Sequence, residues 1–217
     1  NEFIWVAEES GLIVKMGHWI IQTACEAINR LEAVNRMVNA DAQPLFITIN
    51  VSIRQFRDPE LFSTLKKAME VEWLAPSRVK LEITESLVMN NMDAALALLH
   101  RCKELGCKLA VDDFGTGYSS LSYLHKFPMD TLKLDRSFIK EIANDTGAMK
   151  IVRAVAGLAG DLGMDTVCEG TETLEQVNTC RQIGITYAQG FHYSPALPLK
   201  EAAGFIQMRG ATSNKIA

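Results

Sequence analysis

Six short apolar segments of the sequence each end in, or next to, a polar side chain that could bind a metal ion or a phosphate. The residues concerned are Asn50, Glu82, Asp112 with Asp113, Lys133, Glu169 and Gln189. Carboxylate and amide oxygens suit hard divalent cations such as Mg²⁺ or Mn²⁺. Two such ions about 3.5 to 4 Å apart are a standard means of in-line attack on a phosphodiester, and adjacent acids such as Asp112 and Asp113 are a natural bridge between them.

The same acids have a plainer interpretation as helix caps or as partners of surface Lys and Arg. A cap requires Ser, Thr, Asn or Asp, however, and has no use for Glu82, Lys133 or Glu169. Carboxylates about 4 Å apart repel each other by several kcal/mol at intermediate dielectric, so a cluster of them needs positive charge. The recurrence at six consecutive strand ends therefore favours a metal-dependent site, in which we expect Lys133 to be protonated.

A glycine-containing segment, DDFGTGYSS at 112–120, begins at one of these strand ends. Gly115 and Gly117 permit positive φ and let the backbone approach a ligand closely, while Ser119 or Ser120 can cap the helix that follows. Because the segment starts at paired aspartates, it is a candidate for a mobile catalytic loop.

The elements that must position these residues alternate between strand and helix. The predicted strands span 45–51, 79–84, 108–112, 131–134, 165–168 and 185–188, and the predicted helices span 17–38, 59–71, 91–105, 119–127, 147–162, 173–183 and 199–208. Such alternation predicts a parallel α/β sheet with right-handed crossovers, in which the carboxyl ends of the strands share one face. Because a (β/α)₈ barrel closes at eight strands, we expect two more strands upstream of Asn1.

The composition describes a globular chain with a full core. The chain has 217 residues, 48% of them hydrophobic, and a net charge of −4, which argues against a domain that coats nucleic acid. We expect one domain over 1–209 and a polar tail at 210–217. No apolar stretch approaches the roughly 20 residues that span a bilayer.

Five cysteines without a C-x-x-C pair predict reduced thiols. Cys168, with no His beside it, is expected to be an inert buried thiol.

Six segments together carry a family resemblance that extends to about residue 208. They are INVSIRQF (49–56), LEITES (81–86), DDFGTGYSSL (112–121), KLDRSFI (133–139), CEGTET (168–173) and QGF (189–191). These segments resemble the EAL-domain cyclic di-GMP phosphodiesterases of bacterial signalling. The resemblance implies a modified TIM (β/α)₈-type barrel and hydrolysis of cyclic di-GMP to linear pGpG, with two Mg²⁺ or Mn²⁺ ions in each active site.

The resemblance also implies which residues bind the metal ions. Asn50, Glu82 and Asp112 correspond to ligands of the first ion. Asp112, Asp113 and Glu169 correspond to ligands of the second, so that Asp112 bridges the two.

The remaining roles concern catalysis, the substrate and the glycine loop. Lys133 resembles the lysine that contacts the attacking water and the scissile phosphate, and Glu85 resembles the acid that anchors the loop after Asp113. The resemblance thus assigns Lys133, Glu169 and Glu172 to catalysis and Gln189, Lys133 and Asp113 to substrate binding.

The sequence departs from the family pattern in ways that leave a second function open. The Glu-Ala-Leu signature and the Arg that follows it are not present, and both belong upstream of Asn1, so that a sequence trimmed at its N-terminus is the simplest account. Cys168 and Thr171 replace the usual Ala and Val, and Pro195-Ala196 replaces the usual cation and Pro. The alternative function is a catalytically inactive EAL domain that acts as a cyclic di-GMP receptor.

The expected partners also follow from the resemblance. We expect a homodimer, a sensor or GGDEF domain upstream in the parent chain, no DNA, and no membrane insertion by this domain. The expected location is the cytoplasm, which is compatible with a parent chain anchored to the membrane through upstream domains.

Overall fold

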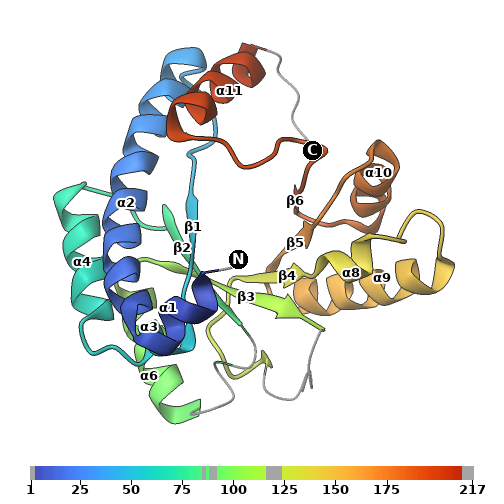
Figure 1. The fold of residues 1–217 in the computed structure, drawn as a ribbon. Helices are drawn as coiled ribbons and strands as arrows, with labels where there is room; N and C mark the ends of the chain where they lie inside the picture. Colours follow the sequence, from blue (N-terminus) through green and yellow to red (C-terminus); the bar gives the residue numbers. More distant parts are fainter. Residues whose placement is uncertain (1–2, 85–86, 88–91, 116–123, 212–217) are drawn as a thin grey trace. The chain divides into compact units, whose positions relative to one another are not determined.

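The computed structural model describes residues 3–84, 87, 92–115 and 124–211. Its strands are neighbours in the same order as in the chain, β1-β2-β3-β4-β5-β6 (Figure 1). Their bounds are β1 (Ile47–Asn50), β2 (Val79–Thr84), β3 (Lys108–Phe114), β4 (Thr131–Leu134), β5 (Asp165–Glu169) and β6 (Tyr187–Gln189). The ladders β3–β4, β4–β5 and β5–β6 are parallel, as the alternation of strand and helix predicts.

The chain divides into two compact units, and each is described by itself. Unit 1 comprises Asn1–Leu81, Glu104–Cys107 and Ala196–Ala217, and unit 2 comprises Glu82–Lys103 and Lys108–Pro195. Strand β2 therefore begins in unit 1 and ends in unit 2.

Unit 1 is built around a long helix. Its helices are α1 (Ile4–Ser10), α2 (Leu12–Val38), α3 (Ile53–Phe56), α4 (Leu61–Val71) and α11 (Leu199–Ala211). The buried residues of α2 recur at three- and four-residue intervals, from Ile13 through Ile21 to Ile28, which is the pattern of a helix with one apolar face. Helix α2 packs against α4 and α11, and the buried Leu61 and Leu65 of α4 contribute to the same core.

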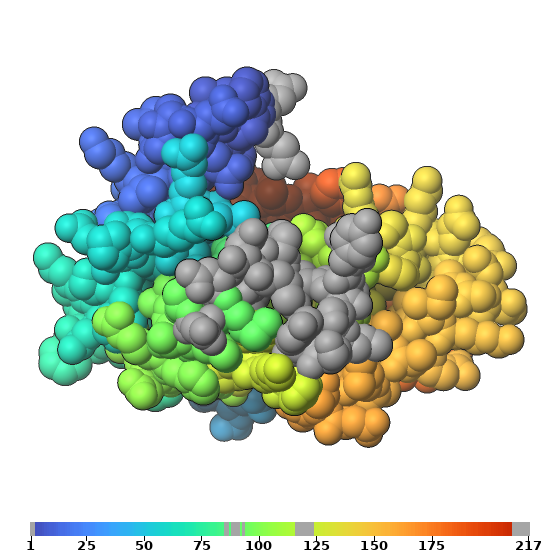
Figure 2. Space-filling model, turned by 90° about the horizontal axis from the view of Figure 1, so that it is seen from below, coloured from blue at the N-terminus to red at the C-terminus, as the bar shows by residue number. Residues whose placement is uncertain are grey.

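Unit 2 places helices beside the parallel strands. They are α6 (Met92–Glu104, except its last residue), α8 (Arg136–Ile139), α9 (Thr146–Asp161) and α10 (Leu174–Ile183). Strand β4 is buried along its whole length. Helix α9 buries only Val152 and Ala159, and its other residues contribute to the yellow-to-orange surface at the right of Figure 2.

The predicted elements agree with the structure apart from their ends and the shortest helices. Helix α4 begins at Leu61 rather than at Pro59, and Asp58 ahead of it accepts a hydrogen bond from Glu60 N through Oδ1 and contacts His18 through Oδ2. The predicted helix 119–127 lies largely outside the described residues. Helices α1, α3 and α8 were not predicted, since segments of four to seven residues hold too few turns to show a period.

Three helices, α6, α9 and α10, are each followed within two residues by a glycine. Gly106, Gly163 and Gly184 have φ of 91°, 71° and 93°, in the left-handed region that glycine tolerates best. No helix in the described ranges has both the length and the apolarity needed to cross a membrane.

Candidate active site

The ammonium group of Lys133 lies among three carboxylates in unit 2. Its Nζ is 2.8 Å from Glu82 Oε2, 2.8 Å from Asp112 Oδ1 and 2.5 Å from Glu169 Oε1. The four side chains come from β4, β2, β3 and β5, and we call them the Lys133 cluster. The structure therefore brings together four of the residues that the sequence predicted to share one face of the sheet.

Strand geometry explains why these side chains meet. In the parallel β4–β5 ladder, Lys133 is in register with Val167 and Leu134 with Cys168. Successive side chains of a strand point to opposite faces, so Val167 and Glu169 share the face of Lys133, while Cys168 shares the face of Leu134. Because Glu169 is the last residue of β5, its carboxylate reaches Lys133 from the carboxyl end of the neighbouring strand.

Lys133 is charged in this setting. Its side chain is only 4% exposed, and burial by itself would lower its pKa. The hydrogen bonds to Asp112, Glu169 and Glu82 outweigh burial and raise the pKa of Lys133 well above its ordinary value. This direction agrees with the expectation that the lysine is protonated.

The carboxylates of the site outnumber the positive charge. Burial raises the pKa of Glu169, and the nearby charges of Asp112 and Glu82 raise it further, although the Lys133 ammonium opposes this change. Burial and the charges of Asp112 and Asp135 likewise raise the pKa of Asp113 above its ordinary value. One ammonium therefore does not neutralise the acids gathered here.

Strand β3 is irregular where its two aspartates lie. Its register with β4 shifts between Val111 and Phe114, and Asp113 has a φ of 55°, in the left-handed region. Bulges of this kind change the direction of a side chain and are frequent beside active sites. Asp113 N donates a hydrogen bond of 3.1 Å to Asp112 Oδ1, which holds the two consecutive acids in this turn.

Residues 1–196 match the EAL domain. The chain belongs to the EAL domain family. Among its relatives, the uncharacterized protein y4lL of Sinorhizobium fredii is 41% identical over 98% of the chain and 24% of its own length. The cyclic di-GMP phosphodiesterase NbdA of Pseudomonas aeruginosa is 35% identical over 95% of the chain and 26% of its own length. The EAL domain described here thus spans about a quarter of the length of these curated relatives.

Solved EAL structures share this fold. The PaMucR phosphodiesterase, solved as a c-di-GMP complex, matches with a TM-score of 0.82 and 35% identity over 92% of this chain and 78% of that one. The resemblance seen in the sequence motifs is therefore confirmed, and so is the prediction of a barrel-type α/β fold.

The donor atoms of this EAL domain suit a divalent cation. Glu82, Asp112, Asp113 and Glu169 offer only oxygen, the ligand atom that Mg²⁺ and Mn²⁺ prefer. Burial first, and then the charges of neighbouring carboxylates, raise the pKa of Asp113 and of Glu169. Within the described ranges, no group of three or more His, Cys, Asp or Glu side chains is arranged to hold an ion. The Lys133 ammonium contacts three of the carboxylates in this arrangement.

Among the other predicted site residues of the EAL domain, Gln189 is in register with Glu169 across the β5–β6 ladder. Asn50 ends β1 in unit 1 with an exposed side chain, and Glu85 lies outside the described residues. Gln189 ends β6 and Glu172 follows β5, both with exposed side chains. Their roles, and that of Asn50 as a ligand, stay predictions.

Sequence reasoning missed one buried residue that organises the loop after Glu169. Gln176 Oε1 accepts hydrogen bonds from Glu172 N (2.7 Å) and Thr173 N (3.0 Å), and its Nε2 donates to Lys140 O. Gln176 and Thr173 form a capping box at the start of α10. The T-x-x-Q spacing of such a box was the available signal.

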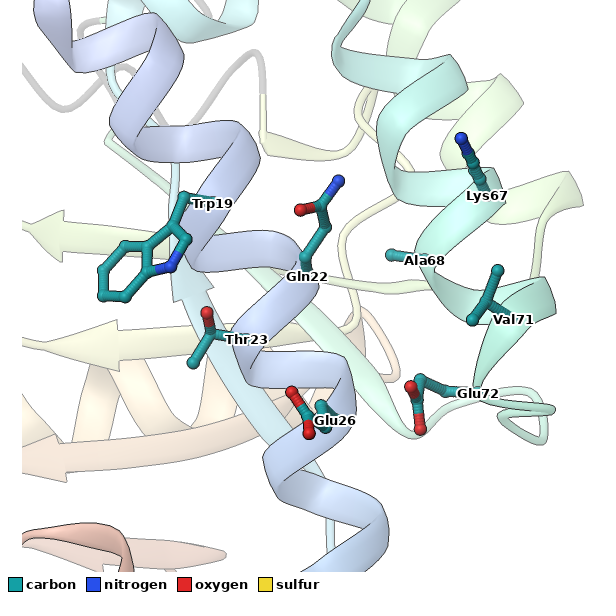
Figure 3. Close-up of a pocket in the computed structure, with 8 residues that line it drawn as sticks. All are labelled: Trp19, Gln22, Thr23, Glu26, Lys67, Ala68, Val71 and Glu72. Carbon is teal, nitrogen blue, oxygen red and sulfur yellow. The ribbon is translucent and has the colours of Figure 1, made fainter.

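Unit 1 contains a separate hollow of about 400 Å³ between α2 and α4 (Figure 3). Its lining mixes Trp19 and Glu26 of α2 with Lys67 of α4 and with Glu72, the residue that caps α4. None of the predicted site residues lines it, so we do not assign the active site to this hollow.

Proposed function

We propose that this EAL domain hydrolyses cyclic di-GMP to linear pGpG with the help of two divalent cations, Mg²⁺ or Mn²⁺. The observation that supports this most is the convergence of Glu82, Asp112 and Glu169 on Lys133 from four neighbouring strands. The name of the relative NbdA, a cyclic di-GMP phosphodiesterase, supports the substrate.

The carboxylates are the residues that would hold the cations. Glu82 and Asp112, with Asn50, would serve one ion, and Asp112, Asp113 and Glu169 the other. Bound divalent cations lower the pKa of a coordinated water and offset charge on phosphoryl oxygens. The excess of negative charge around Lys133 is the electrostatic reason for such cations to bind at this site.

Lys133 supplies the positive charge that the protein itself contributes to the reaction. Hydrolysis forms a bond from a water oxygen to phosphorus, breaks one ester P–O bond, and leaves a proton on the departing ribose oxygen. A lysine held protonated can orient the water and stabilise the additional negative charge on the phosphoryl oxygens. Because the Lys133 side chain is buried, this interaction is weakly screened by solvent.

The activity test compares a site variant with a matched surface variant. The protein is incubated with cyclic di-GMP and Mg²⁺ or Mn²⁺, and pGpG is followed by chromatography. We expect metal-dependent turnover that is lost in Glu82→Gln and kept in Glu141→Gln, because Glu141 is an exposed acid of the same unit. Binding of cyclic di-GMP without turnover under either metal would instead support the receptor function.

We also propose a context for the domain. Homodimerisation, an upstream sensor or GGDEF domain and a cytoplasmic location follow from the family resemblance alone. The greater length of the curated relatives is compatible with further domains in the parent protein.

A further inference from the structure

Two cysteines of unit 2 form a buried thiol pair next to the Lys133 cluster. Cys168 Sγ donates a hydrogen bond to Cys180 Sγ over 3.1 Å. The residues are 0% and 2% exposed, and both thiols are free. All five cysteines lie in the described ranges, and in those ranges Cys168 and Cys180 are the two whose sulfur atoms are hydrogen-bonded to each other.

The fold brings these thiols together from two elements. Cys168 is the fourth residue of β5 and is in register with Leu134 and Ala188 on the strands at either side. Its side chain leaves the sheet on the face opposite to Glu169. Cys180 lies near the end of α10, so the sulfur contact joins this helix to β5.

We propose that Cys168 and Cys180 are a redox-modification site at which a hydroperoxide converts the dithiol into a disulfide. One thiol attacks a peroxide oxygen, the O–O bond breaks, and a sulfenic acid and one water or alcohol form. The second thiol then attacks the sulfenic sulfur, the S–O bond breaks, and water leaves with the remaining proton. The two sulfur atoms lose two electrons in total, and the peroxide gains them.

An oxidant reaches the buried thiols of Cys168 and Cys180 when α10 opens locally. Only Gln176, Val177 and Cys180 of the ten residues of α10 are buried. A helix that buries so few side chains opens at a lower free energy than the surrounding strands, and such opening exposes a thiol without global unfolding. Cys102 is also buried, on α6, but no sulfur atom in the described ranges is hydrogen-bonded to it.

Oxidation would change the position of a residue in the site. A disulfide has sulfur atoms about 2.05 Å apart, so the two thiols must approach by about 1 Å from their present contact. Cys168 is covalently joined to Glu169, whose carboxylate is 2.5 Å from Lys133 Nζ. Helix α10 also holds the backbone of Glu172 through Gln176, so a shift of this helix acts on the same loop.

The consequence for activity rests on the proposed function. A displacement of about 1 Å at a reacting group can cost about a hundredfold in rate. We therefore expect the disulfide form to turn over cyclic di-GMP at about one tenth of the rate of the reduced form or below. Dithiothreitol should restore the rate of the reduced protein.

The thiol modification is measured first, without reference to activity. Reduced protein is treated with hydrogen peroxide, its remaining thiols are alkylated in denaturant because all five cysteines are buried, and the mass of the intact protein and of its non-reduced peptides is determined. We expect two alkylation sites to be lost, a peptide pair linked through Cys168 and Cys180, and recovery of both sites after dithiothreitol. Cys102→Ala is the matched control, since it removes a buried thiol outside the pair and should leave the linkage unchanged.

The outcomes separate this proposal from the proposed function. Alkylation of all five cysteines after peroxide, or the same loss of two sites in Cys180→Val, would overturn the modification site. Unchanged hydrogen exchange over residues 165–184 after the disulfide has formed would overturn its coupling to Glu169. If the reduced protein shows no turnover, the proposed function fails, while the mass and exchange measurements still decide whether the thiol pair behaves as proposed.

Discussion

Lys133 Nζ and Glu169 Oε1 are 2.5 Å apart on the neighbouring parallel strands β4 and β5. The same ammonium also contacts Glu82 and Asp112, so one residue holds three buried or partly buried carboxylates. This relationship makes the electrostatics of the site depend on a single positive charge.

Replacing Lys133 with an uncharged residue of similar length should destabilise the protein in the absence of metal. In Lys133→Met, three carboxylates lose their common partner, and breaking a buried ion pair from one side costs about 3 to 5 kcal/mol. Urea unfolding in the presence of EDTA measures the loss. Added Mg²⁺ should recover part of it by supplying positive charge, and turnover should stay at background.

The control for this change is Lys150→Met, at an exposed position of α9. It should change the free energy of unfolding by less than about 0.5 kcal/mol. Equal losses in the two variants, or no response of Lys133→Met to Mg²⁺, would contradict the electrostatic account of the cluster.

Gly190 should tolerate no side chain. A Cβ at this position would lie 2.2 Å from Thr171 O and 2.4 Å from Thr171 N, which are backbone atoms of the loop that follows Glu169. The surrounding backbone is also tied by hydrogen bonds from Thr171 N to Gln189 O and from His192 N to Thr171 O. Gly190→Ala should lower the free energy of unfolding by about 3 kcal/mol, as overpacking does at the upper end of its range.

Gly204 provides the matched comparison for Gly190. It lies inside α11, and a Cβ there meets nothing within 4 Å. Gly204→Ala should stabilise the protein by about 0.5 to 1 kcal/mol through helix propensity. Urea unfolding of the two variants should therefore give changes of opposite sign, and changes of the same sign would refute the steric argument.

Trp73 should be replaceable by glycine with a gain in stability. It follows α4 with a φ of 52°, and its side chain is 92% exposed. Trp73 N bonds Glu70 O and Leu74 N bonds Met69 O, which is the pattern of a Schellman motif with Trp where glycine is preferred. Trp73→Gly should raise the free energy of unfolding by about 1 kcal/mol by removing left-handed strain.

The backbone origin of this gain is tested with a second substitution. Trp73→Ala keeps a Cβ and should retain most of the strain, so its midpoint in a urea titration should stay near that of the parent protein. If alanine gave the same gain as glycine, the exposed indole rather than the backbone would be responsible.

Asp130 should stabilise the protein at neutral pH and cease to do so in acid. Burial by itself would raise its pKa, but hydrogen bonds from Lys103 Nζ, Lys108 Nζ and Leu109 N lower the pKa of Asp130 below its ordinary value. The unfolded chain therefore takes up this proton at a higher pH than the folded chain. The contribution is fully present above about pH 4 and is lost as the pH falls through the lower folded pKa.

Asp130→Asn removes that charge and tests the sign of the effect. The variant should be about 2 kcal/mol less stable at pH 7, the scale of hydrogen bonds to a charged group, and the difference from the parent should shrink as the pH falls below about 4. Urea unfolding across this pH range measures both the loss of stability at pH 7 and its decrease in acid. Asp161→Asn, at an exposed end of α9, should show neither effect.

The sequence alone was sufficient to predict the strands and the main cluster. The strands that carry Glu82, Asp112, Lys133 and Glu169 could be located because buried strands are apolar runs that end close to polar residues, and a parallel sheet brings the carboxyl ends of its strands together. Positive charge beside the carboxylates was expected, but the contact of Lys133 Nζ with three of them was not, because it depends on the register of β4 with β5 and on side-chain burial.

Other features lay beyond pattern reasoning for physical reasons. The positive φ of Asp113 depends on the bulge in β3, which arises from pairing with β4 rather than from local propensity. The contact of Cys168 with Cys180 joins a strand to a helix twelve residues later, and neither residue signals the other in the sequence. Asp58 contacts His18, forty residues away, and neither residue signals the other in the sequence.

The buried lysine also separates the folding of the chain from the binding of ions. Because the Lys133 ammonium already contacts Glu82, Asp112 and Glu169 and offsets part of their charge, the chain can reach this arrangement without waiting for an ion. Under the proposed function, the cations would bind where one positive charge is already present. Their affinity would depend on the attraction of the carboxylates less the repulsion by Lys133, so the supply of ions would control readiness for chemistry rather than folding.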